Sequence, residues 1–222
     1  MTTAIVDIET DGFDATKIHC IVASSVSGKQ KVWIENECSQ FAEWSKQIDQ
    51  FIMHNGVSFD APILNRLTGS NIKLSQVRDT LIESQLYNPI RDGGHSLQAW
   101  GERLGYSKGD YNDFSTFNKE MLEYCQRDTE ITRRVAGVLS GEGSTFSDRS
   151  YELERKVRAI VDQQERNGFA FNIQKATVFL SQLEDEQHRL EKQAQEMFEP
   201  TKVELKTKTK YIPFNIASRK QI

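Results

Sequence analysis

Residues 3–9, TAIVDIE, are an apolar stretch into which Asp7 and Glu9 are set. The stretch predicts a strand, and side chains two positions apart on a strand point to the same face. Asp7 and Glu9 would therefore project together from the end of an otherwise apolar strand. Two neighbouring carboxylates repel each other, so holding them side by side is costly unless a cation or a proton lies between them.

This pair of acids has two interpretations when it is taken alone. Carboxylate oxygens are suitable ligands for Mg²⁺ or Mn²⁺, which makes the pair a candidate metal site. The pair is equally consistent with a strand that runs out into solvent, because Asp11 and Asp14 continue an acidic loop.

The residues around this stretch predict a mixed sheet. Residues 17–26 and 30–34 are expected to be strands, and the Ser-Gly-Lys turn between them indicates a hairpin. A short buried strand is expected over 51–53. Helices are expected over 39–48, 59–67, 79–87, 96–104, 117–138, 148–166 and 173–198. This order predicts an α/β fold in which a mixed sheet with antiparallel opening strands is flanked by helices.

The chain is expected to divide near residue 142. The sequence Gly-Glu-Gly-Ser over 141–144 is the best linker candidate, and it separates an α/β domain over 1–141 from a segment over 148–222. Two long helices open this second segment, and Asn167-Gly168 is a good stop signal for the first of them. The second segment is therefore expected to be a helical hairpin appended to the first domain.

Composition excludes several classes of protein. The 222 residues are 37% hydrophobic, which is enough for a core, and no apolar run reaches the length of a membrane span. No basic region followed by an apolar one opens the chain, so no secretory signal is visible. Cys20, Cys38 and Cys125 form no CxxC pair, and their odd number suits reduced thiols in a cytosol.

The charge is unevenly distributed along the chain. Residues 1–150 carry 15 Lys and Arg against 21 Asp and Glu, whereas residues 151–222 carry 13 against 11. An acidic first part is unfavourable for binding nucleic acid. It becomes compatible with such binding if several of the acids hold divalent cations, because the metals then reverse the local sign of the charge.

Two further positions could supply acids to a metal site. Asp60 follows Asn55-Gly56 and stands where a helix is expected to begin, so it is either a ligand or a common first-turn acid. Tyr124 and Asp128 lie four residues apart in an expected helix, which places them on one face. They fit either a functional pair or a half-buried tyrosine beside a surface acid.

Taken together, these positions resemble a known set of motifs. The patterns DxE, NxxxFD and YxxxD follow one another as in the DEDD superfamily of 3′→5′ exonucleases. Their residues here are Asp7, Glu9, Asp60, Tyr124 and Asp128. The tyrosine four residues before the last acid matches the Tyr branch of the superfamily. The resemblance implies a ribonuclease H-like fold that binds two divalent cations, Mg²⁺ or in its place Mn²⁺.

The resemblance also implies a role for each of these residues. The four acids Asp7, Glu9, Asp60 and Asp128 would be the metal ligands, and Tyr124 would orient the attacking water. Two metals about 4 Å apart can activate a water and stabilise the departing 3′-oxygen. Tyr124 would then only have to hold the water in line with the bond that breaks.

A closer resemblance is to the exonuclease domain of phage-type family A DNA polymerases. It is carried by the stretches over 54–60, 78–81, 95–105 and 108–111. This resemblance implies that Thr10 and Asn55 contact the terminal nucleotides. It also implies that Phe59 packs beside a base, as aromatic residues do when they hold single strands.

The second segment resembles the opening of the polymerase domain in the same family. Residues 164–169 with the long charged helix after them are similar to its start, and PFNIASRKQI over 213–222 is similar to its thumb. The lysines between them suggest a basic arm near a duplex backbone or a solvated charged hairpin. No palm or fingers motif is present, so the resemblance implies a split or truncated polymerase and no nucleotide addition by this chain.

The expected function is that of a two-metal-ion exonuclease that removes nucleotides from the 3′ ends of DNA, as the proofreading part of such a polymerase. The expected partners are single-stranded DNA 3′ ends and a polymerase region or chain, with no membrane. The expected location is the cytoplasm, that of a bacterial host if a phage encodes the chain. Two alternatives stay open: a free-standing 3′→5′ exoribonuclease and a non-catalytic docking domain for a separate polymerase chain.

Overall fold

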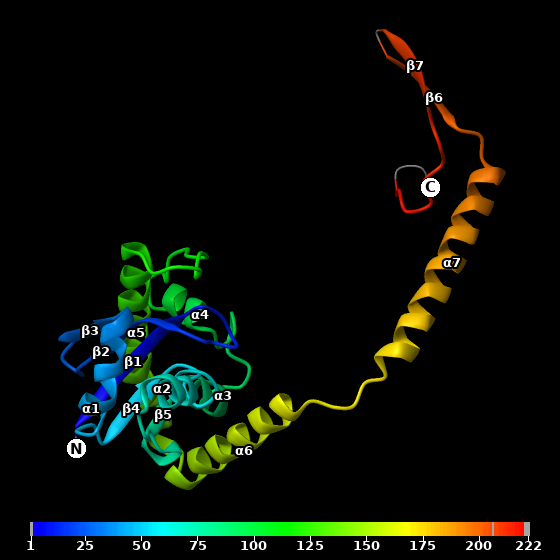
Figure 1. The fold of residues 1–222 in the computed structure, drawn as a ribbon. Helices are drawn as coiled ribbons and strands as arrows, with labels where there is room; N and C mark the ends of the chain where they lie inside the picture. Colours follow the sequence, from blue (N-terminus) through cyan, green and yellow to red (C-terminus); the bar gives the residue numbers. More distant parts are fainter. Residues whose placement is uncertain (1, 206, 220–222) are drawn as a thin grey trace. The chain divides into compact units, whose positions relative to one another are not determined.

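The computed structural model describes residues 2–205 and 207–219 (Figure 1). The chain forms two compact units, Met1–Asn167 and Gly168–Ile222. The first unit thus extends past the linker expected near residue 142 and includes the first of the two long helices. The assignment of 1–141 and 148–222 to different functional domains stays a prediction.

The first unit is built on a five-stranded sheet in the order β3-β2-β1-β4-β5. Its strands are β1 (Thr3–Thr10), β2 (Ile18–Ser24), β3 (Gln30–Ile34), β4 (Gln50–Met53) and β5 (Val77–Asp79). β2 pairs antiparallel with β1 and β3, whereas β4 pairs parallel with β1 and β5. The predicted mixed sheet with antiparallel opening strands is confirmed. β5 is absent from the predicted elements, because a three-residue strand with two charged residues leaves no apolar pattern.

Most predicted helices are present in this unit. They are α1 (Phe41–Ser45), α2 (Asp60–Thr68), α3 (Thr80–Tyr87), α4 (Leu97–Arg103), α5 (Lys119–Glu142) and α6 (Asp148–Asn167). Short 3-10 turns cover Glu35–Gln40, Leu74–Gln76 and Gly143–Thr145. The first helix is shorter than the predicted 39–48, because its N-terminal part is a 3-10 turn. The expected linker at 141–144 is also wrong, because α5 continues through Glu142 and a 3-10 turn follows.

Side chains that alternate along β1 pack into different clusters on the two faces of the sheet. Val6 and Ile8 lie in the larger core together with residues of α1 and α2. Ile5, which is out of phase with them, clusters with Ala136 of α5. Figure 1 shows α5 running along β1 and β2, which it contacts. Because side chains alternate along a strand, Asp7 and Glu9 share the α5 face with Ile5.

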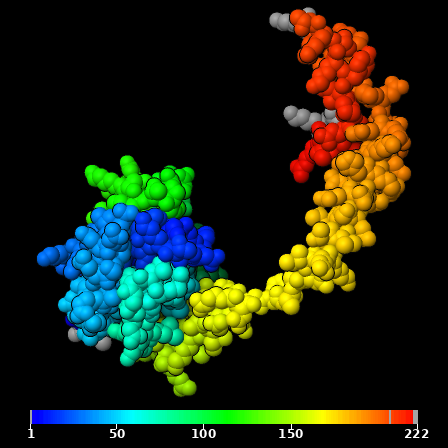
Figure 2. Space-filling model, viewed as in Figure 1, coloured from blue at the N-terminus to red at the C-terminus, as the bar shows by residue number. Residues whose placement is uncertain are grey.

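The second unit consists of α7 (Ile173–Met197) and a two-stranded hairpin of β6 (Thr201–Leu205) and β7 (Lys208–Ile212). No residue of α7 is buried, and Figure 2 shows its side chains uncovered over much of the face in view. The stretch predicted to be a basic arm or a solvated charged hairpin forms this antiparallel hairpin, with Lys202, Lys208 and Lys210 on its strands. Lys206 and the last three residues of the thumb-like segment lie outside the described residues.

Two expectations from composition can be compared with the structure. Within the described residues, no helix is long and apolar enough to cross a membrane. The three cysteines are free and buried, and their expected reduced state in a cytosol stays a prediction.

Candidate metal centre

Three separate elements bring the predicted acids together. Asp7 and Glu9 point from β1 toward α5, as the alternation of the strand requires. Tyr124 and Asp128 lie one turn apart on α5. Asp60 is the first residue of α2 and follows the carboxyl end of β4. In α/β sheets this is the edge at which ligands usually bind.

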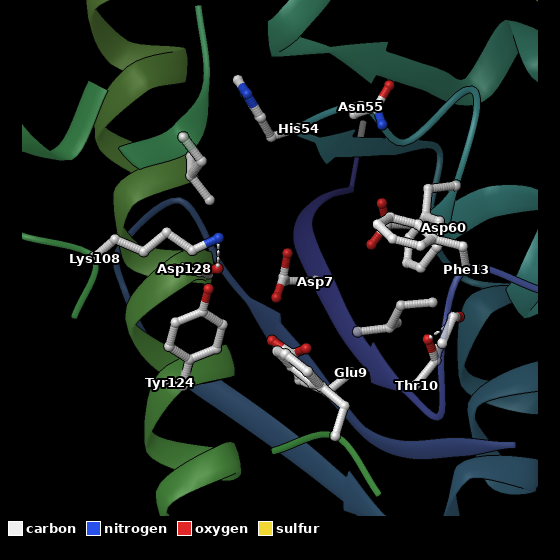
Figure 3. Close-up of a pocket in the computed structure, with 15 residues that line it drawn as sticks. Asp7, Glu9, Thr10, Phe13, His54, Asn55, Asp60, Lys108, Tyr124 and Asp128 are labelled. Atoms are coloured by element: carbon white, nitrogen blue, oxygen red, sulfur yellow. Dashed lines mark hydrogen bonds and ion pairs between the residues drawn. The ribbon is translucent and has the colours of Figure 1, made fainter. Parts of the chain in front are cut away.

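These side chains line one pocket of about 400 Å³. Figure 3 shows the four acids around a common space, with Tyr124 and Lys108 on one side of it and Thr10 and Phe13 on the other. The predicted site residues that line this pocket are Asp7, Glu9, Thr10, Asn55, Phe59, Asp60, Tyr124 and Asp128. The structure therefore brings the whole predicted set to one cavity, while the role of each residue stays a prediction.

Burial, together with the proximity of like charges, raises the pKa values of the acids in the pocket. Burial raises the pKa of Asp7, and the carboxylates of Asp128 and Glu9 raise it further. Burial also raises the pKa of Glu9 to about 8, with Asp128 adding to the shift. For Asp60, burial and the carboxylate of Asp79 raise the pKa to about 8. Without a cation, protons therefore stay on these acids near neutral pH.

Lys108 supplies a compensating charge to this cluster. Its Nζ lies 2.8 Å from Oδ2 of Asp128 and 4.9 Å from the centre of the Tyr124 ring. Burial raises the pKa of Asp128 only to about 6, because Lys108 opposes the shift. Among the described residues that line the pocket, Lys108 is the one Lys or Arg. In the sequence it opens the stretch over 108–111 that carries the family resemblance, but no role was assigned to it.

The donor set of the pocket fits divalent metal ions. Oδ1 of Asp128 is buried and finds no hydrogen-bond partner within the part of the chain that the structure describes. A buried carboxylate oxygen without a partner is costly, and a cation would satisfy it. Clustered carboxylate oxygens are the ligands that Mg²⁺ and Mn²⁺ prefer. The pocket is therefore a candidate divalent-metal centre.

Cys125 is a neighbour of this centre that the motifs do not include. Its Sγ lies 3.4 Å from Oδ2 and 3.5 Å from the backbone oxygen of Asp7. Donor atoms of Asp7, Glu9 and Cys125 all lie within 4.8 Å of one another. Burial raises the pKa of the Cys125 thiol, so the S–H stays protonated and donates toward the Asp7 carboxylate.

Tyr124 is fixed on the wall of the pocket by aromatic neighbours. The centre of its ring lies 5.6 Å from that of Tyr111 and 6.3 Å from that of Phe114, both in the segment before α5. Burial raises the pKa of Tyr124. Its hydroxyl therefore keeps its proton at neutral pH and can donate a hydrogen bond to a bound water.

A tight turn presents Asn55 and Asp60 to the pocket. Asn55 has a φ of 65°, in the left-handed region that few residues other than glycine adopt. A Cβ on the next residue, Gly56, would lie 2.2 Å from a neighbouring side chain, so the turn requires glycine there. The buried carboxylate of Asp79 accepts hydrogen bonds from the backbone N–H of Asn55 at 3.0 Å and of Val57 at 2.9 Å.

Two aromatic side chains stand at the mouth of the pocket. Phe13 is 95% exposed, and its ring meets that of Phe59 edge to face with centres 6.4 Å apart. Thr10 lies beside them, and its Oγ1 donates to the carbonyl of Gly12 at 2.9 Å. Exposed rings next to a polar cavity are suited to stacking on bases. No motif in the sequence marks Phe13, which is one aromatic residue in an acidic loop.

The metal-free chain is expected to lose stability as the pH rises from about 7 to about 8.5. At pH 7 the folded state still holds protons on Glu9 and Asp60, whose pKa values are about 8, and it loses them as the pH rises, whereas the unfolded chain has released them already. The folded state then binds more protons, so the free energy of unfolding falls with rising pH. His54, with a pKa that burial lowers to about 4, is neutral in both states. Thermal melts in EDTA should show a drop of about 5 °C.

Lys108→Met is expected to enlarge this drop, because it removes the cation that faces the acids, and Mg²⁺ should reverse it in both proteins. Lys119→Met is the matched control, since Lys119 is 86% exposed and pairs with Glu123 on the surface. Equal melting temperatures at both pH values in EDTA would contradict the charge arrangement described for the pocket.

The chain is similar in sequence to DNA polymerases of phages. It is 24% identical to the DNA-directed DNA polymerase of Escherichia phage T7 over 233 aligned positions, which cover 75% of this chain and 33% of that protein. It is 29% identical to the DNA-directed DNA polymerase of Enterobacteria phage T3 over 148 residues, 51% of this chain and 21% of that protein. The chain therefore spans a third or less of these relatives. No protein-family model matches it.

In structure, the chain is similar to NrnC of Brucella melitensis with bound Mg²⁺. The TM-score is 0.58 at 19% identity, and the match covers 78% of this chain and 91% of the other. At this identity the likeness shows the fold. The predicted fold class, a ribonuclease H-like mixed sheet flanked by helices, is confirmed, and the phage relatives confirm the resemblance drawn from the motifs.

Proposed function

We propose that this chain is a metal-dependent 3′→5′ exonuclease that removes nucleotides from the 3′ ends of single-stranded DNA. One observation carries the proposal: four carboxylates from β1, α2 and α5 converge on a pocket in which Lys108 is the one Lys or Arg among the described lining residues. Clusters of buried acids with strongly shifted pKa values are typical of functional sites. The phage DNA polymerases among the relatives support DNA as the substrate.

Asp7, Glu9, Asp60 and Asp128 would hold two divalent ions, with Mg²⁺ the first candidate and Mn²⁺ the second. When bound, the ions activate a water and stabilise charge on the leaving oxygen. Asp128 carries the oxygen that lacks a partner within the described residues, so it is well placed to be a ligand. The magnesium ion named for the structurally similar NrnC supports this choice of metal.

The side chains around the acids would bind and orient the substrate. Phe59, with Phe13 beside it, would stack on the terminal bases. Asn55 would contact the terminal nucleotides from the strained turn that Asp79 holds. Thr10 lines the same side of the pocket. Lys108 would help to balance the charge of the scissile phosphate on the α5 side.

Tyr124→Phe is expected to slow cleavage by about 10- to 100-fold. The attacking water would be less well oriented, whereas the four acids that would bind the metal ions are unchanged. Tyr124 keeps its hydroxyl proton and lies beside Lys108, so it suits the task of holding the water in line. Titrating Mg²⁺ against the single-turnover rate should give an unchanged half-saturating concentration. A loss of Mg²⁺ dependence in this variant would contradict the role.

We further propose that the exonuclease works beside a polymerase region, either elsewhere on a longer polypeptide or on another chain, and proofreads for it. The chain spans a third or less of the phage DNA polymerases to which it is similar. Residues 148–222 would belong to the opening of that polymerase region. The cytoplasm of a bacterial host is the location that phage relatives suggest for this activity.

Digestion of a 5′-labelled oligonucleotide tests the proposal, with DNA and RNA of the same sequence in parallel. A ladder that shortens from the 3′ end of the DNA, with much slower loss of RNA, is the expected result. Rapid loss of RNA alone would make the chain an exoribonuclease. No cleavage of either strand by a folded, Mg²⁺-loaded chain would favour the docking alternative.

A further inference from the structure

One face of α6 carries a row of residues that are less exposed than their neighbours. Tyr151, Arg155 and Arg158 are partly buried and Asp162 is buried, while most residues between them are exposed. The spacing of four, three and four residues places them on one side of a helix. Because the row is mostly polar and charged, the apolar pattern of the sequence does not mark it.

The first two residues of this row, Tyr151 and Arg155, form hydrogen bonds with the backbone at the end of β5. The hydroxyl of Tyr151 accepts a hydrogen bond from the backbone N–H of Asp79 at 2.6 Å. It also lies 3.3 Å from the backbone oxygen of Val77, to which the Arg155 guanidinium donates at 3.3 Å. Asp79 is the residue whose carboxylate accepts from Asn55 and so fixes the turn before α2.

The third residue contacts that same turn directly. Nε of Arg158 donates to Oγ of Ser58 at 2.7 Å. A guanidinium nitrogen of Arg158 also lies 2.9 Å from Oδ1 of the buried Asp162, which orients the arginine toward the turn. Ser58 lies two residues before Asp60 in the sequence. The hydrogen bond from Arg158 to Ser58 therefore affects the orientation of the Asp60 carboxylate.

We propose that α6 is a positioning element of the nuclease centre, acting on the turn over 55–59 through Tyr151 and Arg158. The inference rests on the proposed function and deepens it. Residues beyond the expected domain boundary would set the geometry of Asn55 and Asp60. The activity of the α/β core would then depend on the segment that resembles the start of a polymerase domain.

A physical reason for such support lies in the turn itself. Asn55 holds a left-handed backbone conformation that an isolated turn would relax, so surrounding contacts must maintain it. Metal ligands tolerate little displacement, and groups that only orient a ligand commonly affect metal affinity or activity by about 10- to 100-fold. Hydrogen bonds from α6 reach the turn both through Asp79 and through Ser58.

A double-mutant cycle on the full chain tests the proposal. Ser58→Ala, Arg158→Gln and the double variant are compared with the wild type for kcat, KM and the half-saturating concentration of Mg²⁺. Amide hydrogen exchange over 54–60 is measured on the same proteins without substrate. Lys156→Gln is the matched control, because Lys156 lies on the same helix, is 61% exposed and pairs with Glu152 away from the turn.

Each single change is expected to lower kcat/KM by about 10-fold, to raise the half-saturating Mg²⁺ concentration and to speed exchange in the turn. The kcat/KM of the double variant should be no lower than that of either single variant, because both changes break the same contact. Tyr151→Phe should speed exchange as well, through Asp79. The control should match the wild type.

The failure of this inference can be told apart from that of the proposed function. If the wild type cleaves DNA and the variants equal it in kcat/KM and in amide exchange, the role of α6 is overturned. Losses of kcat/KM that add up in the double variant, without faster exchange over 54–60, would overturn it as well.

A wild type that does not cleave DNA would refute the nuclease. Amide exchange would still test whether α6 holds the turn: faster exchange in the variants supports that role, and unchanged exchange overturns it.

Discussion

The double variant Asp7→Ala with Glu9→Ala is expected to lose cleavage of single-stranded DNA by more than about 10³-fold, since metal ions supply several kcal/mol of transition-state stabilisation. It should nevertheless fold. Both side chains line the pocket and leave the apolar face of β1, where Val6 and Ile8 pack, untouched. Removing them also relieves the burial and the repulsion of charge that raise their pKa values.

The variant should therefore melt at a higher temperature than the wild type when both are in EDTA at about pH 8.5, because the wild type must then hold the charges together. Asp14→Ala is the matched control, since Asp14 is exposed in the loop that follows β1. Cleavage at the wild-type rate by the double variant would remove these acids from the site.

Asp128→Asn is expected to slow cleavage by more than about 10²-fold and to raise the half-saturating Mg²⁺ concentration, as the loss of a charged ligand does. The amide keeps the shape of the side chain but not its charge. It also frees Lys108, whose Nζ lies 2.8 Å from the carboxylate.

The Mg²⁺ titration distinguishes this variant from Tyr124→Phe, because only the loss of a ligand shifts the half-saturating concentration. Glu123→Gln controls for the removal of a charge from the same helix, since Glu123 is 61% exposed and pairs with Lys119. An Asp128→Asn variant that binds Mg²⁺ as tightly as the wild type would show that Asp128 is not a ligand.

The arrangement of the acids could be predicted because short-range geometry determines it. Alternation along β1 places Asp7 and Glu9 on one face, and one helical turn separates Tyr124 from Asp128. The order of the motifs then indicated that Asp60 joins them. What the spacing alone could not decide was whether three distant segments meet, and that step depended on the resemblance to known exonucleases.

The support of the site escaped prediction for a physical reason. β5, Asp79 and the inward face of α6 hold the turn through buried polar contacts, whereas sequence patterns report mainly apolar burial. From sequence alone, an aspartate such as Asp79 is expected on the surface. Its burial is understood only once the backbone N–H groups that donate to it are known. The role of Lys108 was missed in the same way, although the resemblance included the stretch over 108–111, because that role depends on its contact with Asp128.

The expected linker shows the opposite error. Two glycines over 141–144 suggested a break, yet α5 runs through Glu142 and α6 follows after a short 3-10 turn. Glycine lowers helix propensity by about 1 kcal/mol relative to alanine, which tertiary contacts readily outweigh. Here Val135 and Leu139 of α5 are buried against α4. This packing stabilises the helix beyond the residue at which the sequence predicts its end.

The most direct test of the account is single-turnover cleavage of a 5′-labelled DNA oligonucleotide by the wild-type chain as Mg²⁺ is added to an EDTA-treated sample. The account predicts no cleavage at first, then products shortened one nucleotide at a time from the 3′ end, at a rate that rises with Mg²⁺ and saturates. Cleavage that persists in EDTA, or none at any Mg²⁺ concentration by a folded chain, would contradict it.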